Sequence, residues 1–167
     1  GDFYATGDGV AQDAGEAVAW YRRAAEQGHA EAQVTLGDLY AAGDGVAQDA
    51  GEAARWVRLA AEQGSASAQH TLGDFYAAGD GVTQDDVEAV RWYQQAAERG
   101  VARAQLDLGD MYFRGLGVGQ DAAEGLRWFL LAAEQGYIPA QTNLAGMYAN
   151  GRGVAQDDAK AVSWYRK

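Results

Sequence analysis

The protein is a chain of 167 residues, 48% of them hydrophobic, in which 24 acidic against 13 basic residues give a formal net charge of −11. This charge argues against nucleic acid and against an anionic membrane surface as partners, because both require clustered lysine and arginine. The sequence has no cysteine, which excludes disulfides and thiolate zinc sites. No apolar run approaches the roughly 18 residues of a membrane-spanning helix, so no membrane insertion is expected.

The sequence repeats with a period of 36 residues. The period contains no insertion or deletion and holds for all five tryptophans, which are Trp20, Trp56, Trp92, Trp128 and Trp164. The same spacing links Tyr4 to Tyr148, Gly7 to Gly151, Gly9 to Gly153, Val10 to Val154, Gln12 to Gln156 and Asp13 to Asp157 through the intervening units. A period of this length is typical of stacked helical repeats. It divides the chain into a partial unit at 1–29, units at 30–65, 66–101 and 102–137, and a partial unit at 138–167.

Each complete unit is predicted to form two helices, as the second unit illustrates. Two apolar stripes with helical spacing predict a first helix over about residues 30–42 and a second over about 50–63. The first stripe consists of Ala32, Leu36, Leu39 and Tyr40, and the second of Ala53, Trp56, Val57, Ala60 and Ala61. One pair of helices cannot bury these side chains alone, so neighbouring pairs are expected to stack into a continuous core.

Residues with capping preferences mark the ends of both helices. Asp49 is expected to accept a hydrogen bond from the first turn of the second helix, where Glu52 meets the favourable field of the helix N-terminus. Gly43 and Gly64 suit the left-handed conformation that closes a helix. In the loop between the two helices, Val46 is the predicted apolar anchor.

Glycine inside the first helix needs a packing reason, because it costs about 1 kcal/mol relative to alanine. It occurs at Gly37, Gly73 and Gly109, and Ala145 stands at the matching position of the last unit. We therefore expect the second helix of each pair to approach closely here. The last two units also depart from the pattern, with Leu116 and Arg152 in place of a loop aspartate, Gly125 in place of alanine, Gly146 in place of aspartate and Lys160 in place of glutamate.

The recurring pattern is A-Q-x-x-L-G-x-x-Y-x-x-G-x-G-V-x-x-D-x-x-x-A-x-x-W-x-x-x-A-A-E-x-G. Over essentially the whole chain it resembles the Sel-one-like repeat family, a relative of the tetratricopeptide repeats. The resemblance implies an all-α fold, a right-handed α-solenoid of about 4.6 antiparallel helix pairs whose first helices line a concave surface. It also implies a protein-binding scaffold or adaptor, and it favours a bacterial periplasmic or secreted location.

The sequence begins inside a first helix and stops inside a second one, so neither end carries a recognisable polar cap. We therefore expect the chain to be a segment of a longer repeat protein. Its terminal repeats offer surfaces for self-association.

The resemblance to tetratricopeptide repeats implies a partner-binding face on the first helix of each pair. Variation among the units concentrates on this face, while the packing positions stay fixed. The candidate residues are Glu31, Val34 and Asp38 in the second unit, Ser67, His70 and Asp74 in the third, Arg103, Leu106, Asp110, Phe113 and Arg114 in the fourth, and Thr142 and Asn150 in the fifth. The alternative is that these positions simply face solvent.

Two features of this face suggest how it binds. Asp2, Asp38, Asp74 and Asp110 form a row of carboxylates that would attract a basic peptide, although solvated aspartates at a recurrent helix position explain the row equally well. In the fourth unit, Phe113 is grouped with Arg103, Leu106 and Arg114, and aromatic and arginine side chains are common interface hot spots. The alternative for Phe113 is packing beneath the next unit.

No cofactor, metal ion or catalytic group is predicted. The loop sequence GDGVAQD lacks the order of oxygen ligands in a calcium-binding loop, and no strand or Lys-Ser pair accompanies its glycines to form a phosphate loop. The only two histidines lie at different phases of the repeat, with His29 expected in a connecting turn and His70 in the groove or on the surface. Recurrent capping explains the abundant carboxylates without acid–base chemistry.

These observations favour a non-enzymatic scaffold that binds a peptide or partner protein on the concave face. The alternative is a structural array that associates through its terminal helices. A hydrolase of cell-wall or antibiotic substrates is a remote third hypothesis, because no residue pattern supports it.

Overall fold

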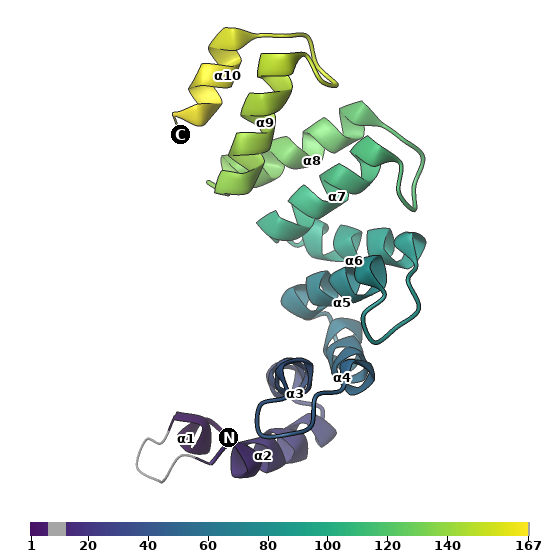
Figure 1. The fold of residues 1–167 in the computed structure, drawn as a ribbon, viewed down its shortest axis with the longest axis vertical. Coiled ribbons are helices and arrows are strands. Elements are labelled where there is room, and N and C mark those ends of the chain that lie inside the picture. The colour runs from purple at the N-terminus through teal and green to yellow at the C-terminus, as the bar shows by residue number, and fades with distance from the viewer. Residues whose placement is uncertain (7–12, 167) are drawn as a thin grey trace. The chain divides into compact units, whose positions relative to one another are not determined.

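The structure is a computed structural model that describes residues 1–6 and 13–166. The repeat positions Gly7, Gly9, Val10 and Gln12 lie outside the described residues. Within the described ranges the chain forms ten α-helices and no strand, as the sequence predicts (Figure 1). None of these helices has the length and apolar character required to cross a membrane.

The chain divides into two compact units. The first unit, Gly1–Asp85, contains α1 (Asp2–Thr6), α2 (Ala14–Glu26), α3 (Ala30–Ala42), α4 (Ala50–Glu62) and α5 (Ala66–Ala78). The second unit, Asp86–Lys167, contains α6 (Asp86–Glu98), α7 (Ala102–Arg114), α8 (Ala122–Glu134), α9 (Ile138–Asn150) and α10 (Asp158–Tyr165). Within each unit, consecutive helices pack against one another.

The predicted helix boundaries in the second repeat are confirmed. The first predicted helix is α3, and the second is α4, which ends one residue before the predicted limit. Asp49 caps α4 by accepting a hydrogen bond from the backbone N–H of Glu52 at 3.0 Å. Gly43 and Gly64 have φ angles of +74° and +88°, in the left-handed region that only glycine adopts without strain.

Glycine permits close helix packing at the predicted places. A Cβ added to Gly37 would lie 2.7 Å from Val57 Cγ2 and 3.2 Å from the carbonyl oxygen of Ala53 on α4. A Cβ on Gly109 would lie 2.8 Å from the ring of Phe129 on α8. The two helices of a pair therefore meet nearly backbone to backbone, which explains why this position stays small.

The core repeats with the sequence. Leu36, Leu72, Leu108 and Leu144 are fully buried, and the indole rings of Trp56, Trp92 and Trp128 are buried as well. In the two terminal repeats the tryptophan is less covered, since Trp20 has 44% of its surface exposed and Trp164 is half-buried. The predicted loop anchor Val46 is partly buried and packs against the core cluster around Leu36.

A buried glutamine joins each pair of helices to the preceding pair. The side-chain amide of this glutamine donates to a backbone carbonyl on the last turn of the preceding second helix. The bonds run from Gln33 to Ala25, Gln69 to Ala61, Gln105 to Ala97 and Gln141 to Ala133, with N···O distances of 3.1, 3.2, 3.1 and 3.1 Å. We call this set the glutamine seam. Sequence reasoning recorded these glutamines as part of the pattern but assigned them no role.

Replacing one seam glutamine by an apolar residue is expected to destabilise the protein. In Gln105→Leu, the carbonyl of Ala97 loses the Gln105 amide and keeps the backbone N–H of Gly100 as a donor, and the amide of Gln135 loses its acceptor Gln105 Oε1, now at 2.7 Å. Each lost hydrogen bond costs about 0.5–1.5 kcal/mol, which urea unfolding would measure. The control is Gln94→Leu, because Gln94 is exposed and its side chain contacts only Glu98 on the same helix. Equal unfolding midpoints for both variants would contradict the role of the seam.

Candidate functional site

The loop between the two helices of each pair folds back onto the first helix. In the second compact unit, the backbone N–H of Asp121 donates to Tyr112 O at 2.9 Å, and that of Asp157 donates to Tyr148 O at 2.9 Å. The side chain of Gln120 also donates to Phe113 O at 2.9 Å. These bonds fix each loop against the end of its helix.

Phe113 alters how the last loop packs. At Gly117, an added Cβ would meet the carbonyl oxygen of Asp86 at 2.1 Å, so backbone touches backbone. At the corresponding Gly153, the atom met is Cε2 of Phe113 at 2.6 Å. The Phe113 ring therefore lies between α7 and the loop that follows α9. Alanine stands at the matching position of the other repeats, at Ala5, Ala41, Ala77 and Ala149.

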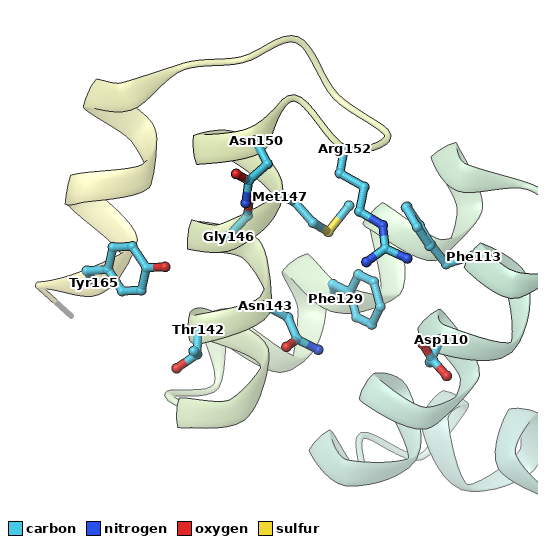
Figure 2. Close-up of a pocket in the computed structure, with 10 residues that line it drawn as sticks. All are labelled: Asp110, Phe113, Phe129, Thr142, Asn143, Gly146, Met147, Asn150, Arg152 and Tyr165. Carbon is cyan, nitrogen blue, oxygen red and sulfur yellow. The ribbon is translucent and has the colours of Figure 1, made fainter.

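Beside this ring lies a surface pocket of about 470 Å³. Figure 2 shows its lining, which consists of Asp110, Phe113, Phe129, Thr142, Asn143, Gly146, Met147, Asn150, Arg152 and Tyr165. Most of these residues come from α7 and α9, the first helices of two successive pairs. We call it the α7–α9 pocket.

The apolar part of the α7–α9 pocket is part of the core. The rings of Phe113 and Phe129 lie 6.5 Å apart between centroids, at an interplanar angle of 43°. Phe129 and Met147 belong to the buried cluster of α8 and α9, and Phe113 packs against it. The pocket floor is therefore held in place by the packing of three helices.

Arg152 is the cation of the pocket. Its guanidinium carbon lies 5.0 Å from the centroid of the Phe113 ring, a cation–π contact. Figure 2 shows the guanidinium beside both phenyl rings, at the mouth of the pocket. In the part of the chain that the structure describes, Arg152 forms no ion pair with a carboxylate.

The other polar side chains of the pocket differ in the ion pairs and hydrogen bonds that they form. Arg114 Nη1 lies 3.0 Å from Asp110 Oδ2, so the only carboxylate of the lining is paired. Asn150 donates to Gly146 O at 2.9 Å, which holds its amide against its own helix. The side chain of Asn143 forms no hydrogen bond within residues 1–6 and 13–166, and it is exposed.

In the second compact unit, residues 86–167, the structure brings together only part of the predicted binding face. Asp110, Phe113, Thr142 and Asn150 line the α7–α9 pocket. Leu106 packs against the core cluster of α8 and α9, while Arg103 and Arg114 are exposed and lie outside the lining. Of the expected grouping, Leu106 and Phe113 pack against the same core cluster, and the two arginines do not line the pocket. Phe113 combines the two alternatives for its role, since it packs under the next loop and also lines a pocket.

In the first compact unit, residues 1–85, the residues of the predicted binding face differ in their exposure. Glu31 is exposed and lines a separate pocket with Asp2 and Tyr21. Ser67 is also exposed, Val34 is half-buried, and partial burial raises the pKa of the Asp38 carboxyl. His29 lies in a connecting turn before α3, as predicted.

The prediction for His70 is wrong. Its ring is buried, with 6% of its surface exposed, so it does not present a side chain to a partner. His70 Nε2 lies 3.6 Å from Asp74 Oδ1, one turn further along α5. The resemblance to tetratricopeptide repeats placed it on the binding face, but the structure buries it.

Sequence reasoning missed five side chains of the pocket lining. They are Phe129, Asn143, Met147, Arg152 and Tyr165. The sequence does distinguish Arg152, because it stands, like Leu116, at the loop position that holds Asp44 and Asp80 in the preceding repeats. The other four lie at positions that the periodicity assigns to packing or leaves unassigned.

The family model of the Sel1 repeat matches residues 1–29, 30–65, 66–101, 102–137 and 138–167. The chain belongs to the Sel1 repeat family. The all-α fold of stacked helical repeats is thereby confirmed. Sel1 repeats are protein-interaction scaffolds, which supports the general class of function expected from the sequence.

Two solved Sel1-repeat structures are similar over nearly the whole chain. A protective antigen of uropathogenic Escherichia coli with an SLR fold has 44% identity and a TM-score of 0.93, covering 98% of this chain and 35% of that one. A Sel1 repeat protein from Oxalobacter formigenes has 39% identity and a TM-score of 0.95, covering 99% and 68% respectively. This chain thus spans about a third of the length of the first relative.

Helicobacter pylori cysteine rich protein B shares the fold at 24% identity, with a TM-score of 0.60, over 77% of this chain and 92% of that one. A search of curated proteins finds none that matches this chain.

Proposed function

We propose that this chain is a binding module that captures an extended peptide of a partner protein along the first helices of its repeats. The observation that carries the proposal is the α7–α9 pocket, in which two successive first helices supply most of the lining. Its volume of about 470 Å³ suits a few side chains of a peptide. The pocket lies on a core-supported floor, which favours a preformed site.

The residues of the pocket are those that bind peptides well. The half-buried Phe113 offers apolar area above the buried Phe129, and Arg152 and Asn143 offer polar groups that make no ion pair or hydrogen bond within the described residues. Interface hot spots typically combine aromatic and arginine side chains in this way. The lining contains no histidine, cysteine or lysine, and its single carboxylate is paired with Arg114, so the arrangement favours binding over catalysis.

The charge of the aspartate row does not define the partner. Asp110 is paired with Arg114, and His70 lies close to Asp74, so two of the four carboxylates have cationic or titratable neighbours. The attraction that a row of free carboxylates would exert on a basic peptide is weakened accordingly. We therefore base the proposal on the pocket and not on the row.

Site-specific photocrosslinking would test this function. A benzoylphenylalanine at Asn143, on the rim of the pocket, is expected to form a discrete adduct with the partner in extracts of the source organism. The same group at Arg127, exposed on α8 and outside the pocket lining, is the matched control and is expected to form none. Equal labelling from both positions, or adduct formation that survives Phe113→Ala, would reject the pocket as the binding site.

A further inference from the structure

We propose that the α7–α9 pocket receives the carboxy-terminal residue of the partner, with its apolar side chain on Phe113 and its free carboxylate on Arg152. The inference rests on the proposed function and specifies which end and which chemistry of the peptide the pocket selects. It follows from the charge of the pocket, the spacing of its groups and the free amide of Asn143.

The uncompensated charge in the pocket is positive. The carboxylate of Asp110 is neutralised by Arg114 at 3.0 Å, whereas Arg152 has no carboxylate partner within residues 1–6 and 13–166. This is unusual in a chain with a net charge of −11, where 24 acidic residues compete for 13 basic ones. The guanidinium of Arg152 contacts the Phe113 ring and donates no side-chain hydrogen bond within the described residues, so its N–H groups are available in the fork geometry that fits a carboxylate.

The spacing of the groups favours a carboxy terminus over an internal acidic residue. The guanidinium lies 5.0 Å from the centroid of the ring that forms the apolar floor. The ligand must therefore place a carboxylate and an apolar group side by side. A terminal residue does so on one Cα, because its carboxylate and its side chain share that atom. An internal aspartate or glutamate carries the carboxylate in place of an apolar side chain.

Asn143 completes the recognition of a chain end. Figure 2 shows its amide projecting from α9 toward the side of the pocket on which Phe129 and Asp110 lie. The group has both a donor and an acceptor, and neither is engaged in the described part of the chain. Its Nδ2 can donate to the terminal carboxylate, and its Oδ1 can accept from the last peptide N–H. A glutamate in the last position offers no apolar group to the Phe113 ring, so a peptide that ends in glutamate is expected to bind weakly.

Fluorescence anisotropy with synthetic peptides would test the inference on the whole chain. The probes are fluorescein-labelled pentapeptides Gly-Ser-Ala-Ser-Leu, Gly-Ser-Ala-Ser-Phe and Gly-Ser-Ala-Ser-Glu, each as the free acid and as the carboxy-terminal amide. The Leu and Phe free acids are expected to bind about tenfold more tightly than their amides, the change that loss of one charge-assisted hydrogen bond produces. The Glu peptide is expected to bind weakly in both forms.

Variants identify the groups responsible. Arg152→Gln is expected to abolish the preference for the free acid, and Phe113→Ala to weaken acid and amide alike. Arg127→Gln removes one positive charge outside the pocket and is expected to change neither affinity. Equal binding of acid and amide, or a preference that survives Arg152→Gln, would overturn the inference.

The outcomes also separate this inference from the proposed function. If peptide amides bind as well as free acids and binding still requires Phe113, the pocket binds peptides but does not select their ends. If no free acid binds, the inference is overturned, while an Asn143 crosslink to a partner protein would still support the binding module.

Discussion

Gly117→Ala is expected to destabilise the second unit by about 3 kcal/mol, combining a strained backbone with a steric clash. The φ angle of Gly117 is +65°, a conformation that costs an L-residue about 1–2 kcal/mol. The added Cβ would also lie 2.1 Å from the carbonyl oxygen of Asp86 and 2.7 Å from the backbone nitrogen of Val87, at the start of α6. These are backbone atoms, so neither can move without displacing the helix. Urea unfolding monitored by tryptophan fluorescence would measure the loss.

The same loop supplies the control for this prediction. Gly119 lies two residues further on, has no left-handed φ, and nothing lies within 4 Å of the place its Cβ would occupy. Gly119→Ala is expected to change the free energy of unfolding by less than about 0.5 kcal/mol. A comparable loss in both variants would show that general loop rigidity, and not contact with α6, is what the glycine at 117 provides.

Leu144→Ala is expected to destabilise the protein by about 2–5 kcal/mol, since it opens a cavity in a well-packed core. Leu144 is fully buried in the cluster that contains Phe129 and Met147, which line the α7–α9 pocket. The cavity is therefore expected to loosen the pocket floor as well. Differential scanning calorimetry would give the stability, and peptide anisotropy the accompanying loss of affinity.

Ile138→Ala on the same helix is the matched control for Leu144→Ala. Ile138 is 72% exposed, so truncating its side chain removes little buried area. Its expected effect is below about 1 kcal/mol, and peptide affinity should not change. A Leu144→Ala protein that unfolds at the wild-type temperature would contradict the assignment of this leucine to the core.

The helices could be predicted from the sequence because their determinants are local. The limits of α3 follow from one apolar stripe and a closing glycine, and the start of α4 follows from the Asp49 cap. Each of these rules acts within a few residues and recurs in every unit, so the repeat checks the prediction several times over. The close approach at Gly37 was predictable for the same reason, since only packing explains a recurrent glycine in a helix.

The pocket could not be predicted, because its geometry depends on residues that break the repeat. Phe113 and Arg152 belong to different repeats, and nothing in the period shows that one side chain covers the other. The burial of His70 illustrates the same limit, since helical spacing gives the direction of a side chain but not what covers it. Sequence reasoning thus identified the variable helix face but not which of its members meet.

The glutamine seam also bears on how such a chain can change in length. Every joint in the described chain is made by the same two partners, a side-chain amide on a first helix and a carbonyl on the second helix before it. A whole repeat duplicated or deleted by recombination in the gene would therefore leave matching surfaces at the new joint. An insertion of any other length would break the match. The array can thus become longer or shorter during evolution without a new kind of interface. A single substitution, such as phenylalanine at position 113 where the other repeats have alanine, makes one joint differ from the others.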